Sequence, residues 1–199
     1  MLDIIVEEQN GFRKGRSCEG HVFSLYSTVK NMVEQNIPIY CAFIDLEKAF
    51  DRIDRSLLMY RLLEYNIDGK MYRAVKSLYN ETQSCVKLNN ELFSDWFDVS
   101  FGVKQGDNLS PTLFSLYINE LCKEINQFNI GVKVGNRSIS MLLYADDMVL
   151  VTDKEENLQK MLDTMHSWCN KWRLNVNKSK SQIVHFRKPR QKCTEYMFK

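Results

Sequence analysis

The chain has 199 residues, with 44% hydrophobic and 26% charged residues, eight glycines and three prolines. This length and composition suit one globular domain and exclude disordered, collagen-like and linker-dominated classes. The net charge of +2 is unevenly spread, because residues 171–199 hold nine Lys or Arg against one Glu, and the preceding residues hold 18 basic against 24 acidic ones. A basic end is typical of a solvated face or of a polyanion-binding surface, and both interpretations stay open here.

No segment indicates membrane insertion or export. The longest unbroken apolar run, Ile39–Ile44, is far shorter than the roughly 20 residues of a membrane-spanning helix. The acidic N-terminus lacks a secretory or mitochondrial targeting pattern, so we expect a protein of the nucleus or cytoplasm without a membrane partner. The six cysteines form no CxxC pair and predict reduced thiols in the core rather than a zinc module.

The first part of the chain predicts three helices around a short strand. Ser17 can cap a helix that keeps apolar residues at helical spacing and ends near Asn36. Residues 39–45 are apolar and end in an acid, as a central strand does where it opens onto a polar site. Two further helices are predicted to begin near Asp54 and Asp68.

A hairpin and a long helix come next. Residues 84–103 alternate between apolar and polar around an Asn89-Asn90 turn, which predicts two strands with one buried face. Ser110-Pro111 is a strong helix start because serine can accept bonds from the first-turn amides and proline fits the first helical position. This helix is predicted to run to about Phe128.

The last third predicts a second hairpin, a helix and a final strand. Two acids interrupt the apolar hairpin of residues 139–151, and Asp153 with Glu156 resembles a capping box for the helix that follows. The strand of residues 182–186 then leads into the basic end. The alternation of strands and helices predicts an α+β sheet with helices packed on one face.

Asp146 and Asp147 are the two acids of the second hairpin, and no cation lies near them in sequence. They suit either an exposed hairpin tip, where Asp is a favoured turn residue, or a site for a hard divalent cation, which takes oxygen ligands. Neighbouring side chains of a strand face opposite ways, so Asp146 is the firmer ligand and Asp147 depends on the turn.

A third acid, Asp45, directly follows the first apolar strand. It can be a loop acid paired with Lys48 or Arg52, or the second half of a metal site. Two strand-end acids in one sheet could hold two metal ions about 3.5 to 4 Å apart, the arrangement that stabilises both oxygens of a phosphoryl transfer. Mg²⁺ is the expected ion because it binds through a few carboxylates and the phosphates of the substrate.

Five runs of sequence follow one another in order along the chain: QNGFRKGRSC (9–18), FIDLEKAFDRIDR (43–55), FGVKQGDNLSPTLFSLYINEL (101–121), LLYADDMVL (142–150) and WRLNVNKSKSQIV (172–184). Together they resemble the motif series of reverse transcriptases. The YADD tetrapeptide is a weak match alone, whereas five ordered motifs over nearly the whole chain are a strong one. The KAFD and QGDNLSP sequences are more similar to the non-LTR (LINE-type) retrotransposon polymerases than to the retroviral or group II intron branches.

The resemblance implies a right-hand polymerase palm with an antiparallel sheet, plus part of the fingers. Residues 1–36 would be partial fingers, 37–186 the palm, and 187–199 a basic end leading toward an absent primer grip and thumb. The implied activity is RNA-templated DNA synthesis on a DNA primer from dNTPs, with two Mg²⁺ ions for which Mn²⁺ can substitute. An incomplete or inactive fragment stays open as an alternative.

The resemblance also implies roles for single residues. Asp45 and Asp146 match the metal-binding aspartates, with Asp147 as the adjoining acid and the Leu46 carbonyl as a further ligand. Phe50 matches the aromatic residue beneath the sugar of the incoming nucleotide, where a ring leaves no room for a 2′-hydroxyl.

Other implied contacts involve the nucleotide and its phosphates. Gln105 and Gly106 match a turn that contacts nucleotide and template. Arg13 and Arg16 resemble fingers cations that face the triphosphate, although a solvated basic loop explains them nearly as well. Lys180 aligns with a lysine proposed to donate a proton to the departing pyrophosphate, and the neighbouring Lys178 is an alternative for this role.

Two rivals come from other classes. A non-catalytic RNA-binding module similar to an RRM would show stacked aromatic residues in an RNP-type motif, which the sequence lacks. A nucleotide cyclase also uses two acids on a similar sheet, but it needs no template.

Overall fold

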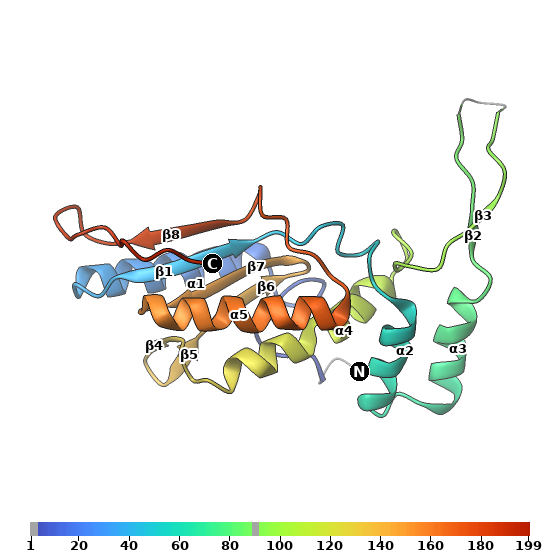
Figure 1. The fold of residues 1–199 in the computed structure, drawn as a ribbon. Coiled ribbons are helices and arrows are strands. Elements are labelled where there is room, and N and C mark those ends of the chain that lie inside the picture. The colour runs from blue at the N-terminus through green and yellow to red at the C-terminus, as the bar shows by residue number, and fades with distance from the viewer. Residues whose placement is uncertain (1–3, 89–91) are drawn as a thin grey trace.

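A four-stranded antiparallel sheet with the order β6-β7-β1-β8 forms the centre of the molecule (Figure 1). The structure is a computed structural model that describes residues 4–88 and 92–199. The strands of the sheet are β1 (Ile39–Ile44), β6 (Met141–Tyr144), β7 (Asp147–Thr152) and β8 (Gln182–Phe186). The helices are α1 (Cys18–Glu34), α2 (Arg55–Glu64), α3 (Gly69–Tyr79), α4 (Ser110–Asn126) and α5 (Glu155–Trp172). Two short antiparallel pairs are β2 (Gln83–Ser84) with β3 (Phe97–Asp98), and β4 (Val132–Val134) with β5 (Arg137–Ile139).

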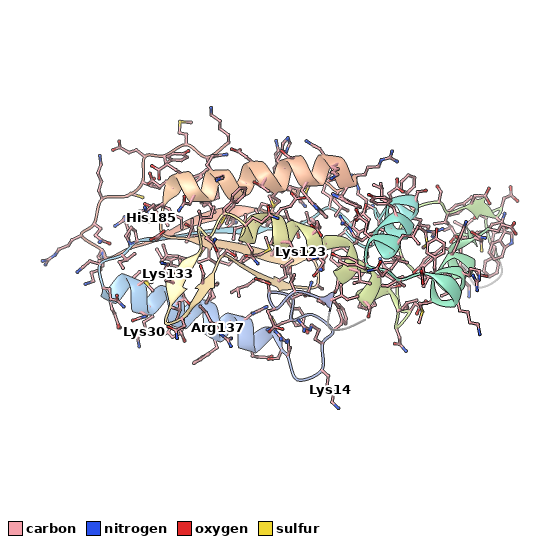
Figure 2. The ribbon with its side chains drawn as sticks, turned by 90° about the horizontal axis from the view of Figure 1, so that it is seen from below. Lys14, Lys30, Lys123, Lys133, Arg137 and His185 are labelled. Atoms are coloured by element: carbon pink, nitrogen blue, oxygen red, sulfur yellow. The ribbon has the colours of Figure 1, made fainter. Side chains whose placement is uncertain are left out.

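Helices α4 and α5 form the expected layer on one face of the sheet, where Ala42 and Ile44 of β1 join the main hydrophobic core. The other face is not left bare. There α1 lies across the sheet, and its Met32 packs in a second core with Ile39 and Cys41. The strands therefore run between α1 and α5, as Figure 2 shows. Since successive residues of a strand face opposite ways, coverage on both faces explains the unbroken apolar sequence of β1.

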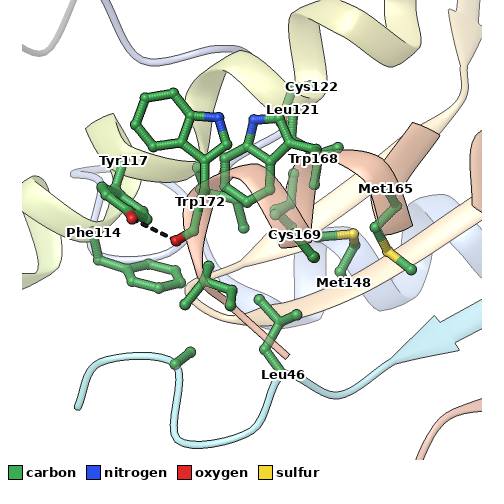
Figure 3. Packing of buried hydrophobic residues seen from close by; sticks show 14 of the residues in the cluster. Leu46, Phe114, Tyr117, Leu121, Cys122, Met148, Met165, Trp168, Cys169 and Trp172 are labelled. Carbon is green, nitrogen blue, oxygen red and sulfur yellow. Dashed lines mark hydrogen bonds between the residues drawn. The ribbon is translucent and has the colours of Figure 1, made fainter. Parts of the chain in front are cut away.

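An aromatic cluster joins α4 to α5 behind the sheet (Figure 3). The rings of Trp168 and Trp172 stack with centroids 5.8 Å apart, and the ring of Tyr117 meets both of them edge-on. The Tyr117 hydroxyl donates a 2.7 Å hydrogen bond to the Trp172 carbonyl in the last turn of α5. This buried contact sets the position of α5, the helix that follows β7 in the chain.

The predicted helix cap at Ser17 and the predicted helix start near Asp54 are confirmed. The Ser17 hydroxyl accepts a 3.1 Å hydrogen bond from the amide of Gly20. The Asp54 carboxylate accepts bonds from the amides of Ser56 and Leu57 at the start of α2. Asp68 stands at the cap position of α3 but makes no capping hydrogen bond with its side chain.

Two other predicted capping arrangements are wrong, although α4 begins at Ser110-Pro111 as predicted. Ser110 is the first residue of α4 rather than its cap, and its hydroxyl donates to the Lys104 carbonyl, while the Asp107 carboxylate accepts from the Leu109 amide. The predicted capping box is absent from the described start of α5, which follows Lys154 without a side-chain cap. At α4 the Ser110 hydroxyl thus bonds to the preceding loop instead of to the first-turn amides that the local pattern assigns to it.

The first hairpin is less buried than its alternating pattern predicts. Residues 82–88 and 92–99 extend away from the sheet as an arm (Figure 1), and the predicted Asn89-Asn90 turn lies outside the described residues. Val86, Leu88 and Phe97 are 52%, 64% and 49% exposed, so the expected buried face is wrong along the arm, whereas Val103 beyond it is buried. At the base of the arm the Arg55 guanidinium donates to the Thr82 hydroxyl and to the Gly102 carbonyl.

The six cysteines are all free thiols, as predicted, but only Cys41, Cys122 and Cys169 are buried. Cys18 and Cys193 are exposed, which corrects the expectation of core thiols at these positions. None of the helices within residues 4–88 and 92–199 combines the length and the apolar character needed to traverse a bilayer.

Candidate active site

The second hairpin turns over two residues, Ala145 and Asp146, between the paired residues Tyr144 and Asp147. Ala145 has a φ of +58°, a left-handed conformation that is unfavourable for a residue with a Cβ atom. Backbone conformations of this kind persist only where the surroundings hold them, and they are frequent at functional sites. Asp146 is half-buried in this turn, and the exposed Asp147 is the first residue of β7.

Asp45 lies across from this turn. The last register pair between β1 and β7 joins Ile44 to Met148, so Asp45 and Asp147 stand one position beyond it, opposite each other. Both carboxylates line one cavity of about 340 Å³ together with Tyr144. The structure therefore brings together two acids that are about 100 positions apart in the chain, at one end of neighbouring strands.

The electrostatics of the site are those of uncompensated negative charge. Burial raises the pKa of the Asp146 carboxyl, and the nearby carboxylates of Asp147 and Asp45 raise it further, against a hydrogen bond from its own backbone amide. In the described part of the chain no Lys, Arg or His forms an ion pair with any of these three acids. A cation bound here would offset the mutual repulsion of the carboxylates.

The donor set fits a hard divalent cation, although it is not a closed cage. Within residues 4–88 and 92–199 no three His, Cys, Asp or Glu side chains are arranged so that they could hold a metal ion on their own. Mg²⁺ ordinarily keeps several waters and uses one or two carboxylates together with substrate phosphates. Carboxylates from two strand ends therefore suit an ion that arrives with a phosphate-bearing substrate.

A loop before β8 supports the strand end at Asp45. The Asp45 amide donates to the Ser181 hydroxyl at 3.1 Å, and the Asn177 amide donates to the Asp45 carbonyl at 2.8 Å. Lys180 lines the same cavity as Asp45, whereas Lys178 lines a different cavity. Of the two lysines that the sequence leaves open, the geometry favours Lys180.

The turn that follows Asp45 carries Phe50 toward the Gln105 loop. The half-buried Phe50 ring stacks on the ring of Phe114 with centroids 4.5 Å apart, and its carbonyl accepts a bond from the amide of Val103. The Gln105 side chain is exposed and donates to the Asp51 carboxylate at 2.8 Å. Gly106, with a φ of +85°, takes a conformation that glycine adopts without strain.

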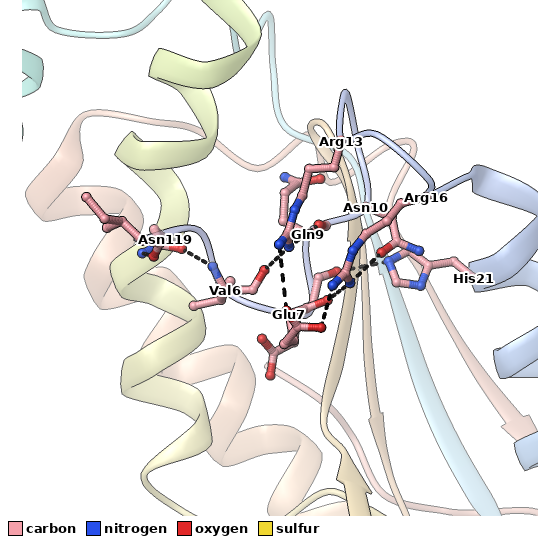
Figure 4. Close-up of polar contacts among 10 residues, drawn as sticks. Val6, Glu7, Gln9, Asn10, Arg13, Arg16, His21 and Asn119 are labelled. Atoms are coloured by element: carbon pink, nitrogen blue, oxygen red, sulfur yellow. Dashed lines mark hydrogen bonds and ion pairs between the residues drawn. The ribbon is translucent and has the colours of Figure 1, made fainter. Parts of the chain in front are cut away.

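Arg13 and Arg16 turn back onto their own segment (Figure 4). The Arg13 guanidinium donates to the carbonyls of Val6 and Gln9, at 2.8 and 3.1 Å. Arg16 donates to the Glu7 carbonyl and pairs with the Glu7 carboxylate at 2.5 Å, which lowers the pKa of Glu7. Both cations thus stabilise a loop in this structure, and their contact with a triphosphate stays a prediction.

One residue at the site escaped the sequence analysis. Gln9 is only 1% exposed, and its amide makes hydrogen bonds to both the amide and the carbonyl of Ala145. It belongs to a motif used for the family resemblance, but nothing local indicates a role, because its partner is 136 positions away in the chain.

An antiparallel sheet backed by two helices, with acids at the ends of β1 and of the β6-β7 hairpin, is the arrangement expected for a right-hand palm. The family described as "Reverse transcriptase (RNA-dependent DNA polymerase)" matches residues 1–197. The chain therefore belongs to the reverse transcriptase family, which confirms the resemblance and the α+β palm fold.

Curated relatives come from non-LTR elements, as the sequence predicts. The chain is 30% identical over 188 residues to the Retrovirus-related Pol polyprotein of the Drosophila melanogaster element R2DM, covering 94% of this chain and 18% of that protein. It is 24% identical over 191 residues to the RNA-directed DNA polymerase of the Drosophila funebris mobile element jockey, covering 93% and 20%. The chain thus spans only a small part of these relatives' lengths.

The fold is also found in solved structures. Telomerase from Candida tropicalis, truncated from its C-terminal domain, superposes with a TM-score of 0.69 at 16% identity. The similarity covers 89% of this chain and 36% of the telomerase chain. At this identity the match supports the fold of the sheet and helices.

Proposed function

We propose that the chain is the palm, with an adjoining part of the fingers, of an RNA-directed DNA polymerase that extends a DNA primer on an RNA template. The observation that carries this proposal is the meeting of Asp45 and Asp147 in one cavity beside Asp146, in a member of the reverse transcriptase family. Under this proposal residues 1–36 are partial fingers, 37–186 the palm, and 187–199 the basic end on the way to a primer grip.

The acids and the Leu46 carbonyl would hold the metal. When bound, a pair of Mg²⁺ ions, or Mn²⁺ in their place, supplies charge stabilisation to the attacking and leaving oxygens of a phosphoryl transfer. Asp45 follows β1, and Asp146 and Asp147 are held by the β6-β7 hairpin, so the chain itself fixes where these oxygen ligands lie. Positioning of this kind is a large part of catalysis in phosphoryl transfer.

The remaining residues would act on the dNTP and the primer. The Lys180 ammonium, which lines the cavity with Asp45, holds a proton that the departing pyrophosphate can take. The Phe50 ring occupies the place of a 2′-hydroxyl, and Gln105 with Gly106 contacts the nucleotide and the template. Arg13 and Arg16 would reach the triphosphate by exchanging their present partners on the segment around Glu7.

The test is primer extension on an RNA template with Mg²⁺. Asp146→Asn removes a charged ligand and is expected to lower the extension rate by roughly 1,000-fold, since a metal contributes several kcal/mol to the transition state. Asp163→Asn, on the exposed side of α5, is the matched control and should leave the rate unchanged. Undiminished extension by Asp146→Asn would refute the assignment, and a wild-type chain without extension would indicate the inactive remnant.

The RRM-like alternative finds no support in the site. A module of that kind binds RNA on an open sheet face with stacked aromatic residues. Here α1 lies across the face of the sheet opposite α4 and α5, with Met32 packed on Ile39. Binding of RNA that needs no divalent cation, by a chain that never extends a primer, would instead favour this alternative.

A further inference from the structure

The buried amide of Gln9 bonds to the catalytic turn from outside the hairpin. Its Oε1 accepts hydrogen bonds from the amides of Ala145, at 2.9 Å, and Gly11, at 2.8 Å. Its Nε2 donates to the Ala145 carbonyl at 3.0 Å. Both backbone polar groups of Ala145 are thus satisfied by one side chain that is 1% exposed.

We propose that Gln9 is a positioning residue for the metal ligands: it holds the Ala145-Asp146 turn in its left-handed conformation and thereby fixes the carboxylates of Asp146 and Asp147. This inference rests on the proposed metal-binding role of these acids. Gln9 acts through the backbone of the turn and makes no recorded contact with either carboxylate among the described residues.

The turn needs an external partner because of its own geometry. Ala145 has a φ of +58°, where an alanine is disfavoured, so the hairpin alone does not specify this conformation strongly. A side chain that bonds both the N–H and the C=O of that residue selects one orientation of the peptide units on either side of it. The direction in which Asp146 leaves the turn then depends on Gln9.

Gln9 is itself held firmly in place. The Asn10 amide donates to the Leu143 carbonyl and the Leu143 amide donates to the Glu8 carbonyl, both at 2.9 Å, so residues 8–10 run as a parallel partner along β6. The His21 Nε2 lies 2.9 and 3.0 Å from the carbonyls of Glu8 and Leu143 and donates to this junction from α1. The segment on which Gln9 stands is therefore bound from two sides.

Gly11 shows how close the approach is. A Cβ atom at position 11 would lie 2.3 Å from the Ala145 nitrogen, a distance that no side chain can accept. The backbone at position 11 therefore passes directly against the turn, which only glycine allows, and this approach lets the Gln9 amide reach Ala145. Only a glutamine offers a donor and an acceptor at this reach, because asparagine is one methylene shorter and glutamate lacks the donor.

The experiment compares Gln9→Met with wild type in two measurements. Amide hydrogen exchange at Ala145, followed by NMR in the metal-free chain, reports how well the turn is stabilised. We expect the Ala145 amide of Gln9→Met to exchange faster than in wild type. Mn²⁺ affinity, measured by electron paramagnetic resonance with Mn²⁺ alone, reports whether the carboxylate ligands are correctly positioned. We expect it to fall about 10-fold, the lower end of the effect of removing groups that orient metal ligands.

Asn119→Leu is the matched control, because Asn119 is another fully buried amide with three hydrogen bonds. It accepts from the Val6 amide and donates to the Ile4 carbonyl and the Tyr65 hydroxyl, away from the turn. We expect this variant to lose stability while keeping wild-type Mn²⁺ affinity and Ala145 exchange. Equal losses of Mn²⁺ affinity in both variants would overturn the positioning role, since the effect would then be general loosening.

Two further variants keep the outcome decisive. Gln9→Asn retains the amide but shortens it, and it replaces Gln9→Met with the same expected losses if the methionine variant does not fold. Asp146→Asn separates the two proposals. If it leaves Mn²⁺ affinity intact, the proposed metal site fails; if it lowers the affinity while the Gln9 variants do not, only the inference about Gln9 fails.

Discussion

At the scale of single residues, Ala145 combines a small side chain with a backbone conformation that few residues tolerate. Its φ of +58° and its burial leave little freedom for a larger or β-branched side chain. Ala145→Val is expected to lower the free energy of unfolding by about 1–3 kcal/mol, the usual range for such strain. Ala145→Gly removes the steric conflict and should stay within about 1 kcal/mol of wild type.

Urea unfolding of the two Ala145 variants checks this prediction. Equal stability of the valine and glycine variants would contradict it, because the strain would then not depend on the Cβ atom. If the slope of the unfolding free energy against urea concentration is the same in both variants, the difference in their stability arises in the folded state.

The thiols give a second prediction at this scale. Burial raises the pKa of Cys41 and of Cys169 to about 12, so hardly any thiolate forms at either residue near neutral pH. Cys18 and Cys193 are exposed. Iodoacetamide at pH 8 should therefore modify these two first in the folded chain, as read by mass spectrometry. Similar labelling rates at Cys41 in folded and urea-unfolded chains would show that it is not buried.

At the scale of elements, the contact between α4 and α5 stabilises the helix layer that packs on the sheet. Trp168 is 2% exposed and touches both Tyr117 and Trp172. Trp168→Ala is expected to lower the free energy of unfolding by about 3–5 kcal/mol, because it removes a large buried ring and leaves a cavity. Urea or thermal unfolding measures this loss.

Trp96→Ala is the matched control for this substitution. Trp96 lies on the projecting arm and is 68% exposed, so its removal should change stability by no more than about 0.5 kcal/mol. Comparable losses in the two variants would mean that the arm packs against the body in solution.

The same scale explains why some element boundaries escape local patterns. The caps at Ser17 and Asp54 are predictable because donor and acceptor lie within three residues of each other. Ser110 instead bonds to Lys104 in the preceding loop. The alternating arm is another case, since its period correctly predicts strands while its burial depends on whether another surface covers it.

At the scale of the whole molecule, the basic end folds back against the body. Phe198 packs on the main core, the Lys199 amide donates to Gln159 of α5, and the Lys188 ammonium donates to the Glu34 carbonyl at the end of α1. Arg190 is exposed, and the exposed Lys192 pairs with the exposed Glu195. Of these cations, Arg190 and Lys192 are the ones most open to a nucleic-acid backbone.

Binding to a primer-template duplex should therefore depend on salt through these two cations. The double variant Arg190→Ala, Lys192→Ala is expected to reduce the slope of log affinity against log salt by up to about 0.9 per lost phosphate contact. Fluorescence anisotropy at several KCl concentrations measures the slope, and Lys70→Ala with Lys76→Ala on α3 serves as the charge-matched control. A slope equal to that of wild type would favour the solvated-face interpretation of the basic end.

The sequence alone predicts the chain order of the helices and of the four central-sheet strands, the acids at the ends of β1 and β6 and, through five ordered motifs, the family. It does not predict the short β4-β5 pair. These features can be predicted because periodicity, turn residues and motif sequences are properties of residues close together in the chain. The burial of β1 on both faces could not be read in the same way, because it depends on α1 lying across the sheet.

Which distant groups meet becomes visible in the folded chain. It placed Asp147 opposite Asp45 in register, put Lys180 rather than Lys178 in the cavity of the acids, and joined Gln9 to Ala145. The physical reason is that a hydrogen bond or a shared cavity between segments far apart depends on strand register and packing, which the whole core sets and no local pattern reports.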